Sequence, residues 1–186
     1  LTVAEGAKLI INAGTTVNIP AGDRIIVEGS ICAGDSSCGA SPASTGNPVR
    51  LRWASAPDEG TGNCYFNPIN NPDTACGSGV FLDYTIDRAL TKLNYVFFEN
   101  AYGIPVEVTQ GVYRYGALIL NDATIEARGL SFEDINTTNL LVLNSAAPTI
   151  SDSIFTLGVD ENGYHGPAIQ AHDAGKGILG RLTIRN

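Results

Sequence analysis

Short stretches of alternating apolar residues, each closed by a glycine, open the chain. The first 29 residues contain the units LTVAEG, LIINAG, VNIPAG and IIVEG. Period-two alternation places every second side chain on one face of a strand, and glycine tolerates the positive φ of a tight corner. The pattern therefore predicts strands of about three residues joined by tight corners.

Two all-β arrangements could use such units, an antiparallel meander or a coil that turns the same way at every corner. Meander strands usually run about 5–6 residues with Asn-Gly or Asp-Gly hairpins, whereas the corners here read Glu-Gly and Ala-Gly. Three units make a turn of about 24 residues, which stacks Ile25 and Val27 over Leu1 and Val3. We therefore predict a parallel β-helix, a solenoid whose rungs bury one another.

Later parts of the chain repeat this rung imperfectly. YVFFENA, GLSFEDI, DSIFTLG and GRLTIRN superpose as apolar, any, apolar, any, polar. Their apolar positions are expected to face inward and to be buried: Val96, Phe98, Leu130, Phe132, Ile154, Leu182 and Ile184. The positions between them, such as Ser131 and Thr183, are expected on the surface. Trp53, the single tryptophan of the chain, is expected to fill the coil interior.

A length of 186 residues is most simply one β-helix domain over 1–186. Two loop insertions, at about 32–48 and 55–78, carry the cysteines and are rich in turn residues, so they are expected to protrude from the coil. The sequence opens with neither a Met nor a signal peptide. We expect it to be a processed or excised segment of a longer chain.

The charge balance argues against two classes of partner. Eleven basic residues against nineteen acidic ones give a formal net charge of −8. A phosphate backbone would be repelled and an anionic membrane surface would offer no attraction. The apolar runs are also far shorter than the roughly 20 residues of a membrane span. Nucleic acid and a membrane span are therefore not expected.

Four cysteines form two local pairs, Cys32 with Cys38 and Cys64 with Cys76, inside the loop insertions. Zinc is the competing interpretation, but no C-x-x-C spacing or nearby histidine supports it. Of the three possible disulfide connectivities, local pairing is favoured. Two disulfides indicate an extracellular or cell-surface location.

The pattern resembles the right-handed parallel β-helix superfamily, which comprises the pectate-lyase-like solenoids. It resembles in particular the β-helix modules of secreted and surface-attached microbial proteins. The matching stretches are residues 1–17, 29–33, 48–51 and 93–101, together with APTISDSIF. These are packing residues, so the resemblance implies a right-handed coil more firmly than it implies an activity.

Enzymes with this fold are chiefly pectate and pectin lyases and polygalacturonases. The resemblance implies that an active member would carry clustered Asp residues with calcium and an Arg base, or paired carboxylates with N-x-D, D-D, G-H-G and R-I-K signatures. This chain keeps only His165-Gly166 of G-H-G, has no Asp-Asp pair, and reads LTIRN in place of R-I-K. These departures favour a protein without hydrolase activity.

One pair of carboxylates has the spacing of an acid/base pair. Glu99 stacked over Glu133 at the strand spacing of about 4.8 Å would fit a glycosidase geometry. The same corner holds Asn100, Asp134 and Asn186, which favours a polar ladder that caps backbone groups.

The stretch VDENGYHGPAIQAHD gathers Asp160, Glu161, His165, His172 and Asp173. A divalent cation such as calcium is one interpretation. An exposed turn is the other, because the oxygen ligands lack the alternating spacing of a calcium loop. No other cofactor is expected.

Two further candidates lie on the predicted surface. Tyr113 and Tyr115 should occupy one side of a strand and Arg114 the other, an arrangement that suits either carbohydrate stacking or partial burial. Asn136 begins the sequon Asn136-Thr137-Thr138, a possible site of glycan attachment.

Two hypotheses for function follow. The first is a non-catalytic extracellular or cell-surface module that is structural or adhesive, as a spacer or filament subunit, with neighbouring copies or further domains stacked on its end rungs. The second is a polysaccharide lyase or glycoside hydrolase with a divergent active site. A convergent cluster of acid, base and cation would separate them, and none can be assembled from the sequence.

Overall fold

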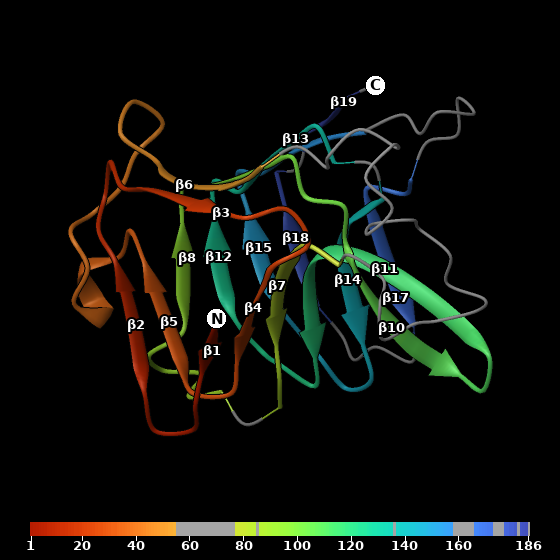
Figure 1. Cartoon of the computed structure of the whole chain (residues 1–186). Helices are drawn as coiled ribbons and strands as arrows, with labels where there is room; N and C mark the ends of the chain where they lie inside the picture. The colour runs from red at the N-terminus through yellow and green to blue at the C-terminus, as the bar shows by residue number, and fades with distance from the viewer. Residues whose placement is uncertain are drawn as a thin grey trace.

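The computed structural model describes residues 1–54, 77–84, 86–135, 137–157, 166–172, 177–181 and 183–185. In this part of the chain the protein is all-β, with one short 3-10 helix, η1 (Ser36–Cys38). Nearly all strands belong to three parallel sheets, A, B and C (Figure 1).

The strands of each sheet follow one another in chain order. Sheet A holds β1 (Thr2–Val3), β4 (Arg24–Val27), β7 (Gly79–Leu82), β11 (Val112–Asn121), β14 (Thr138–Leu143) and β17 (Ile169–His172). Sheet B holds β2 (Lys8–Ile11), β5 (Ser30–Ala33), β8 (Lys92–Asn94), β12 (Glu126–Arg128), β15 (Thr149–Ser151) and β18 (Ile178–Gly180). Sheet C holds β3 (Thr16–Ile19), β6 (Val49–Trp53), β9 (Val96–Glu99), β13 (Ser131–Glu133), β16 (Ile154–Thr156) and β19 (Thr183–Arg185).

The chain visits the sheets in the repeating order A, B, C, and each visit adds one strand next to the previous one. Thr2 pairs with Ile26, 24 residues further along the chain, and Val3 pairs with Val27. The predicted 24-residue first turn is therefore confirmed. Some other turns are longer because loops enlarge them, as between Thr16 and its partner Arg50. The arrangement is compatible with a β-helix.

A residue with positive φ follows each sheet B strand on the way to sheet C: Gly14, Gly34, Tyr95, Gly129, Asp152 and Arg181. In the last four of these connections it makes the corner with at most one further residue, whereas Gly14 and Gly34 lie in longer connections. Each bend also stacks on the next turn, since Tyr95 N donates to Arg128 O and Gly129 N donates to Ser151 O. Glycine meets the steric demand of this conformation without cost, whereas Tyr95 and Arg181 adopt it with a side chain.

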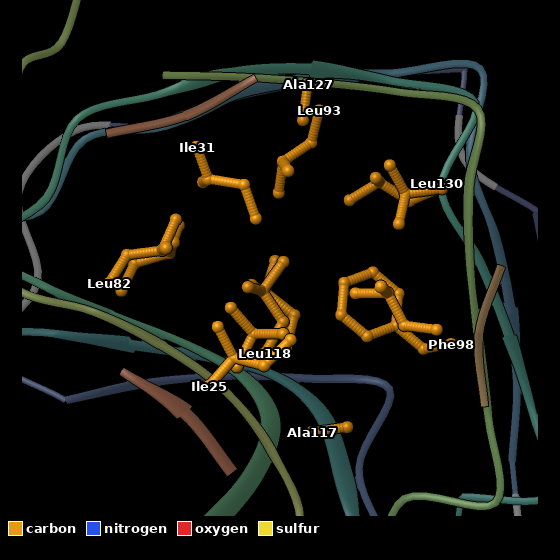
Figure 2. Packing of buried hydrophobic residues seen from close by; sticks show 14 of the residues in the cluster. Ile25, Ile31, Leu82, Leu93, Phe98, Ala117, Leu118, Ala127 and Leu130 are labelled. Carbon is orange, nitrogen blue, oxygen red and sulfur yellow. The ribbon is translucent and has the colours of Figure 1, made fainter. Parts of the chain in front are cut away.

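The interior is a continuous apolar column enclosed by the three sheets (Figure 2). Leu82, Leu118, Leu93 and Phe98 point from different sheets into one shared space. On the sheet C side, four aromatic rings stack in sequence: Trp53, Phe98, Phe132 and Phe155, at 6.5, 4.8 and 4.9 Å between successive centroids. Trp53 is fully buried, as the sequence predicted, and its Nε1 donates to Asp23 O at 2.8 Å.

The inward positions predicted for two of the four later stretches are confirmed. Val96, Phe98, Leu130 and Phe132 are buried. Ile154 was predicted to face inward, but Phe155 takes that place, because Phe155 pairs with Phe132 while Ile154 pairs with Ser131.

The reason for this shift is the corner before the strand. Asp152 bends the chain and Ser153, not Ile154, occupies the position of Leu130, whose backbone N–H donates to Ser153 Oγ. Ser131 was predicted on the surface and is instead 6% exposed, although it faces away from the coil interior.

Ile184 corrects a second expectation. Its register partner is Phe155, so it lies on the inward row, yet the residue is 59% exposed. It belongs to β19, which has only β16 as a partner strand within the described part of the chain. An inward position is therefore not sufficient for burial at an end turn. Leu182 lies outside the described residues.

A hairpin that the sequence did not predict leaves the coil at sheet A. β10 (Ile104–Thr109) pairs antiparallel with the first half of β11, and the second half of β11 continues the parallel sheet. Ile104 on the hairpin packs with Ile119, Leu141 and Leu143 on the outer face of sheet A. Val106 and Val108 pack against the same cluster, so the hairpin forms a second, smaller apolar core.

The loop between β5 and β6 covers part of the outer face of sheet B. The predicted disulfide between Cys32 and Cys38 is present, with the two Cα atoms 5.7 Å apart. Hydrogen bonds tie the loop to two neighbouring turns: Ser41 N donates to Asn12 Oδ1, and Asn94 Nδ2 donates to Asp35 Oδ2. Cys64 and Cys76 lie outside the described residues.

Candidate functional site

The outer face of sheet C carries a group of three charged side chains that contact one another. Arg50 Nη1 pairs with Glu99 Oε1, and Arg52 Nε pairs with Glu99 Oε2 at 2.6 Å. Strand register produces this contact, because Arg52 and Glu99 are Cα partners in β6 and β9. The Arg50 guanidinium also lies 5.0 Å from the centroid of the Phe97 ring. The sequence reasoning missed both arginines, although alternation in VRLRW already placed them outward.

Glu99 and Glu133 are strand partners, as predicted. Their environments differ, since Glu99 is 7% exposed whereas Glu133 is exposed. Both carboxylate oxygens of Glu99 already accept hydrogen bonds from guanidinium groups. An acid or base must reach the proton that it transfers, and Glu99 is engaged elsewhere. Glu99 and Glu133 are therefore neighbours across paired strands, but Glu99 lacks the accessibility that a catalytic acid or base needs.

The predicted polar corner residues adopt turn conformations. Asn100 and Asp134 both have positive φ, and Asn100 N donates to Glu133 O. A second polar ladder, not predicted, lies at the corner between sheets A and B. There Asn121 Nδ2 donates to Asp83 Oδ1 and Asn144 Nδ2 donates to Asn121 Oδ1. Asn186 lies outside the described residues.

Asp152 forms an ion-pair clamp at the corner between sheets B and C. Arg128 Nε lies 2.8 Å from Asp152 Oδ2, and Arg181 Nε lies 2.5 Å from Asp152 Oδ1. Burial alone would raise the pKa of the Asp152 carboxyl, but hydrogen bonds from Arg181 and Arg128 together with their charges lower it below its ordinary value. The clamp joins three successive turns of the coil.

The hairpin places the predicted tyrosines as expected. Tyr115 pairs with Pro105, Arg114 with Val106 and Tyr113 with Glu107, so the tyrosines share one face and Arg114 lies on the other. Burial, and next the neighbouring Tyr113, raise the pKa of the Tyr115 hydroxyl. All three side chains are half-buried. Carbohydrate contact by these residues stays a prediction.

The predicted cation site can be followed only at His172, the last residue of β17. Asp160, Glu161, His165 and Asp173 lie outside the described residues, as does the sequon residue Asn136. Within the described ranges, no three His, Cys, Asp or Glu side chains gather closely enough to hold a metal ion. Nor does any helix in those ranges have the length and apolar character of a membrane span.

No protein-family model matches this chain, and neither a curated protein nor a solved structure is significantly similar to it. The candidate sites therefore rest on their own geometry.

Proposed function

We propose that this chain is a rigid, non-catalytic module of an extracellular or cell-surface protein, built as a right-handed parallel β-helix, with a structural or adhesive role. The observation that carries the proposal is the continuous interior column, in which each turn buries the apolar face of its neighbours. Such a column resists bending and keeps its ends at a fixed distance, which is what a spacer requires.

The right-handed coil is supported by a general rule. Connections between parallel strands of one sheet are right-handed in about 98% of cases. Each connection from β1 to β4 and onward passes through sheets B and C before it returns to sheet A. The same rule therefore applies at every turn.

The end strands supply the argument for partners. Among the described residues, β1, β2 and β3 pair on one side only, as do β17, β18 and β19 at the other end. Unpaired edges favour pairing with further strands. Under this proposal, further domains of the same polypeptide or neighbouring copies of the chain continue the three sheets, and in the second case the assembly is a filament.

An adhesive role would use the hairpin. Tyr113 and Tyr115 share a face with Glu107, and aromatic rings beside a carboxylate suit contact with a sugar ring. The alternative function, a polysaccharide lyase or glycoside hydrolase with a divergent site, is favoured by one observation, the strand pairing of Glu99 with Glu133. The two arginines that occupy Glu99 count against it.

Incubation with polyuronides and neutral glycans, with and without calcium, separates the two functions. The structural proposal expects neither new reducing ends nor unsaturated products. Release of either product, abolished by Glu133→Gln, would establish the enzyme instead. Electron microscopy of the purified chain at high concentration tests assembly, where end-to-end particles are expected for the filament version.

A further inference from the structure

A depression of about 320 Å³ lies at the carboxyl ends of two neighbouring strands of sheet C. It is lined by Asn18, Ile19, Pro20, Arg52, Trp53 and Ala54. It lies where both strands end together, because Ile19 and Trp53 are Cα partners and each is the last residue of its strand. The sequence reasoning assigned these residues no role beyond packing.

The walls of this depression are held in place. Ala54 N donates to Ile19 O at 2.8 Å, and Asp23 N closes the turn by donating to Pro20 O. Trp53 Nε1 donates to Asp23 O, which fastens that turn to the buried indole. A preformed site loses little conformational freedom when a ligand binds.

Two side chains of the depression, Arg52 and Asn18, offer hydrogen-bond donors. Arg52 is anchored through Nε to Glu99, and no described residue accepts a hydrogen bond from its two terminal nitrogens. Its side chain is 49% exposed. The exposed amide of Asn18 lies on the same outward row, as the Cα partner of Arg52. The backbone N–H of Ala54 is already used, and Pro20 has none.

Local charge also favours an anion. Arg50 and Arg52 share one buried carboxylate, so these three residues carry one positive charge in excess. Asp23 and Arg24, which are both exposed at the adjoining turn, carry opposite charges. Glu133 stands two strands away from Arg52 and is exposed, so solvent screens it. The overall charge of −8 acts over distances at which salt screening is strong.

We propose that the depression binds a small carboxylate of single-ring size, with the carboxylate on the free edge of the Arg52 guanidinium and the amide of Asn18. Arginine binds carboxylates through two parallel hydrogen bonds. Ile19, Pro20 and Ala54 provide an apolar wall for the ring. The volume lies at the lower end of the range of about 300–1,000 Å³ for ligand pockets, which suits one ring and not a polymer segment. This site does not depend on the structural role proposed above.

Binding is tested on the whole chain by titration calorimetry with two matched pairs of probes, glucuronate against glucose and benzoate against benzamide. Each pair differs in the carboxylate, and the two pairs separate a sugar acid from an aromatic acid. At least one carboxylate is expected to bind with millimolar or tighter affinity and about tenfold more tightly than its neutral counterpart. Failure of both carboxylates to bind at about 10 mM, or equal binding of the neutral probes, overturns the proposal.

Variants locate the site. Arg52→Gln is expected to weaken binding at least tenfold, Asn18→Ala about threefold or more, and Arg52→Lys to restore part of the affinity. Arg128→Gln is the matched control, because Arg128 also pairs with a carboxylate through Nε but lies at another corner. The Arg128→Gln variant should bind the carboxylate probes with unchanged affinity. Arg50 remains on Glu99 in Arg52→Gln. If Arg52→Gln fails to fold, Asn18→Ala decides, since Asn18 is exposed and its replacement should not affect folding. An unchanged affinity of the Asn18→Ala variant then rejects the site.

Discussion

The rings of Phe98 and Phe132 stack inside the coil with their centroids 4.8 Å apart and their planes 12° apart. The two residues are Cα partners in β9 and β13, so the ring distance equals the spacing between hydrogen-bonded strands. Trp53 and Phe155 extend the stack in both directions. From Phe98 to Phe155 sheet pairing and side-chain stacking therefore repeat at one common distance, whereas the Trp53 ring lies 6.5 Å from Phe98.

Removing a ring from the middle of this stack should be costly. Phe132→Ala is expected to lower the free energy of unfolding by about 3–5 kcal/mol, because it leaves a cavity with aromatic neighbours on both sides. Urea denaturation followed by circular dichroism measures the loss. Phe97→Ala is the control, since Phe97 is half-buried on the outer face of the neighbouring strand β9. An equal loss in both variants would contradict a special role for the interior stack.

Trp53 should report on the interior. It is the single tryptophan of the chain and is fully buried against Phe98. We expect blue-shifted fluorescence that iodide does not quench, and a red shift that coincides with the loss of the circular dichroism signal in urea. A red shift at lower urea than the circular dichroism transition would show that the first turns open separately.

The disulfide should restrain its loop without being required for the coil. Cys32→Ala/Cys38→Ala is expected to cost about 2–3 kcal/mol, because a short closed loop limits the unfolded chain. The far-ultraviolet circular dichroism spectrum of the folded state should be retained, since the hydrogen bonds of Ser41 and Asn94 also hold the loop. Loss of the β signal in the variant would mean that the bridge is needed to assemble the sheets.

Acid should weaken the corner clamp at Asp152. Its pKa is lowered in the folded state, so its contribution to stability is complete above the ordinary pKa of 3.8 and is lost as the pH falls through the lower folded value. Asp152→Asn should remove this contribution at neutral pH. The variant should therefore have a lower urea midpoint than the natural chain at pH 7, and the two midpoints should become similar near pH 2.

Salt provides a second check on the same clamp. Arg128 and Arg181 are both more than half exposed, so added salt should screen their pairing with Asp152. The difference in urea midpoint between Asp152→Asn and the natural chain at pH 7 should therefore become smaller. Glu5→Gln serves as a control for a general effect of charge, because Glu5 is exposed and lies at a different corner. A constant difference between Asp152→Asn and the natural chain from pH 7 to pH 2 would refute the clamp.

The parallel coil was predictable because its signal is local and repeated. Alternation and corner glycines fix the first turn, and the pairing of Val3 with Val27 follows directly. The prediction for Ile154 was wrong because the corner before it is made by Asp152 and not by a glycine, so the sequence did not mark where the strand begins. Ile154 comes one residue before Phe155, which is the inward residue. Period-two patterns are sensitive to such a shift, since one residue reverses the side-chain face.

The outer contacts were harder to predict because they join residues far apart in the chain. Arg52 and Glu99 meet only through the pairing of β6 with β9, across a loop whose length the alternation does not reveal. The depression beside Asn18 likewise depends on the pairing of β3 with β6, which places Asn18 next to Arg52. Inward positions follow from sequence pattern, whereas outward neighbours require the strand register.

The hairpin has a further consequence for how the molecule comes apart. A stack of similar turns with only nearest-neighbour contacts frays from its ends. Ile104 binds Ile119 and Leu141, which belong to successive turns, and Phe81 of the turn before packs against the same cluster. The hairpin thus connects three middle turns through one apolar cluster. Amide hydrogens there should exchange last, and opening that begins at either end should halt when it reaches them.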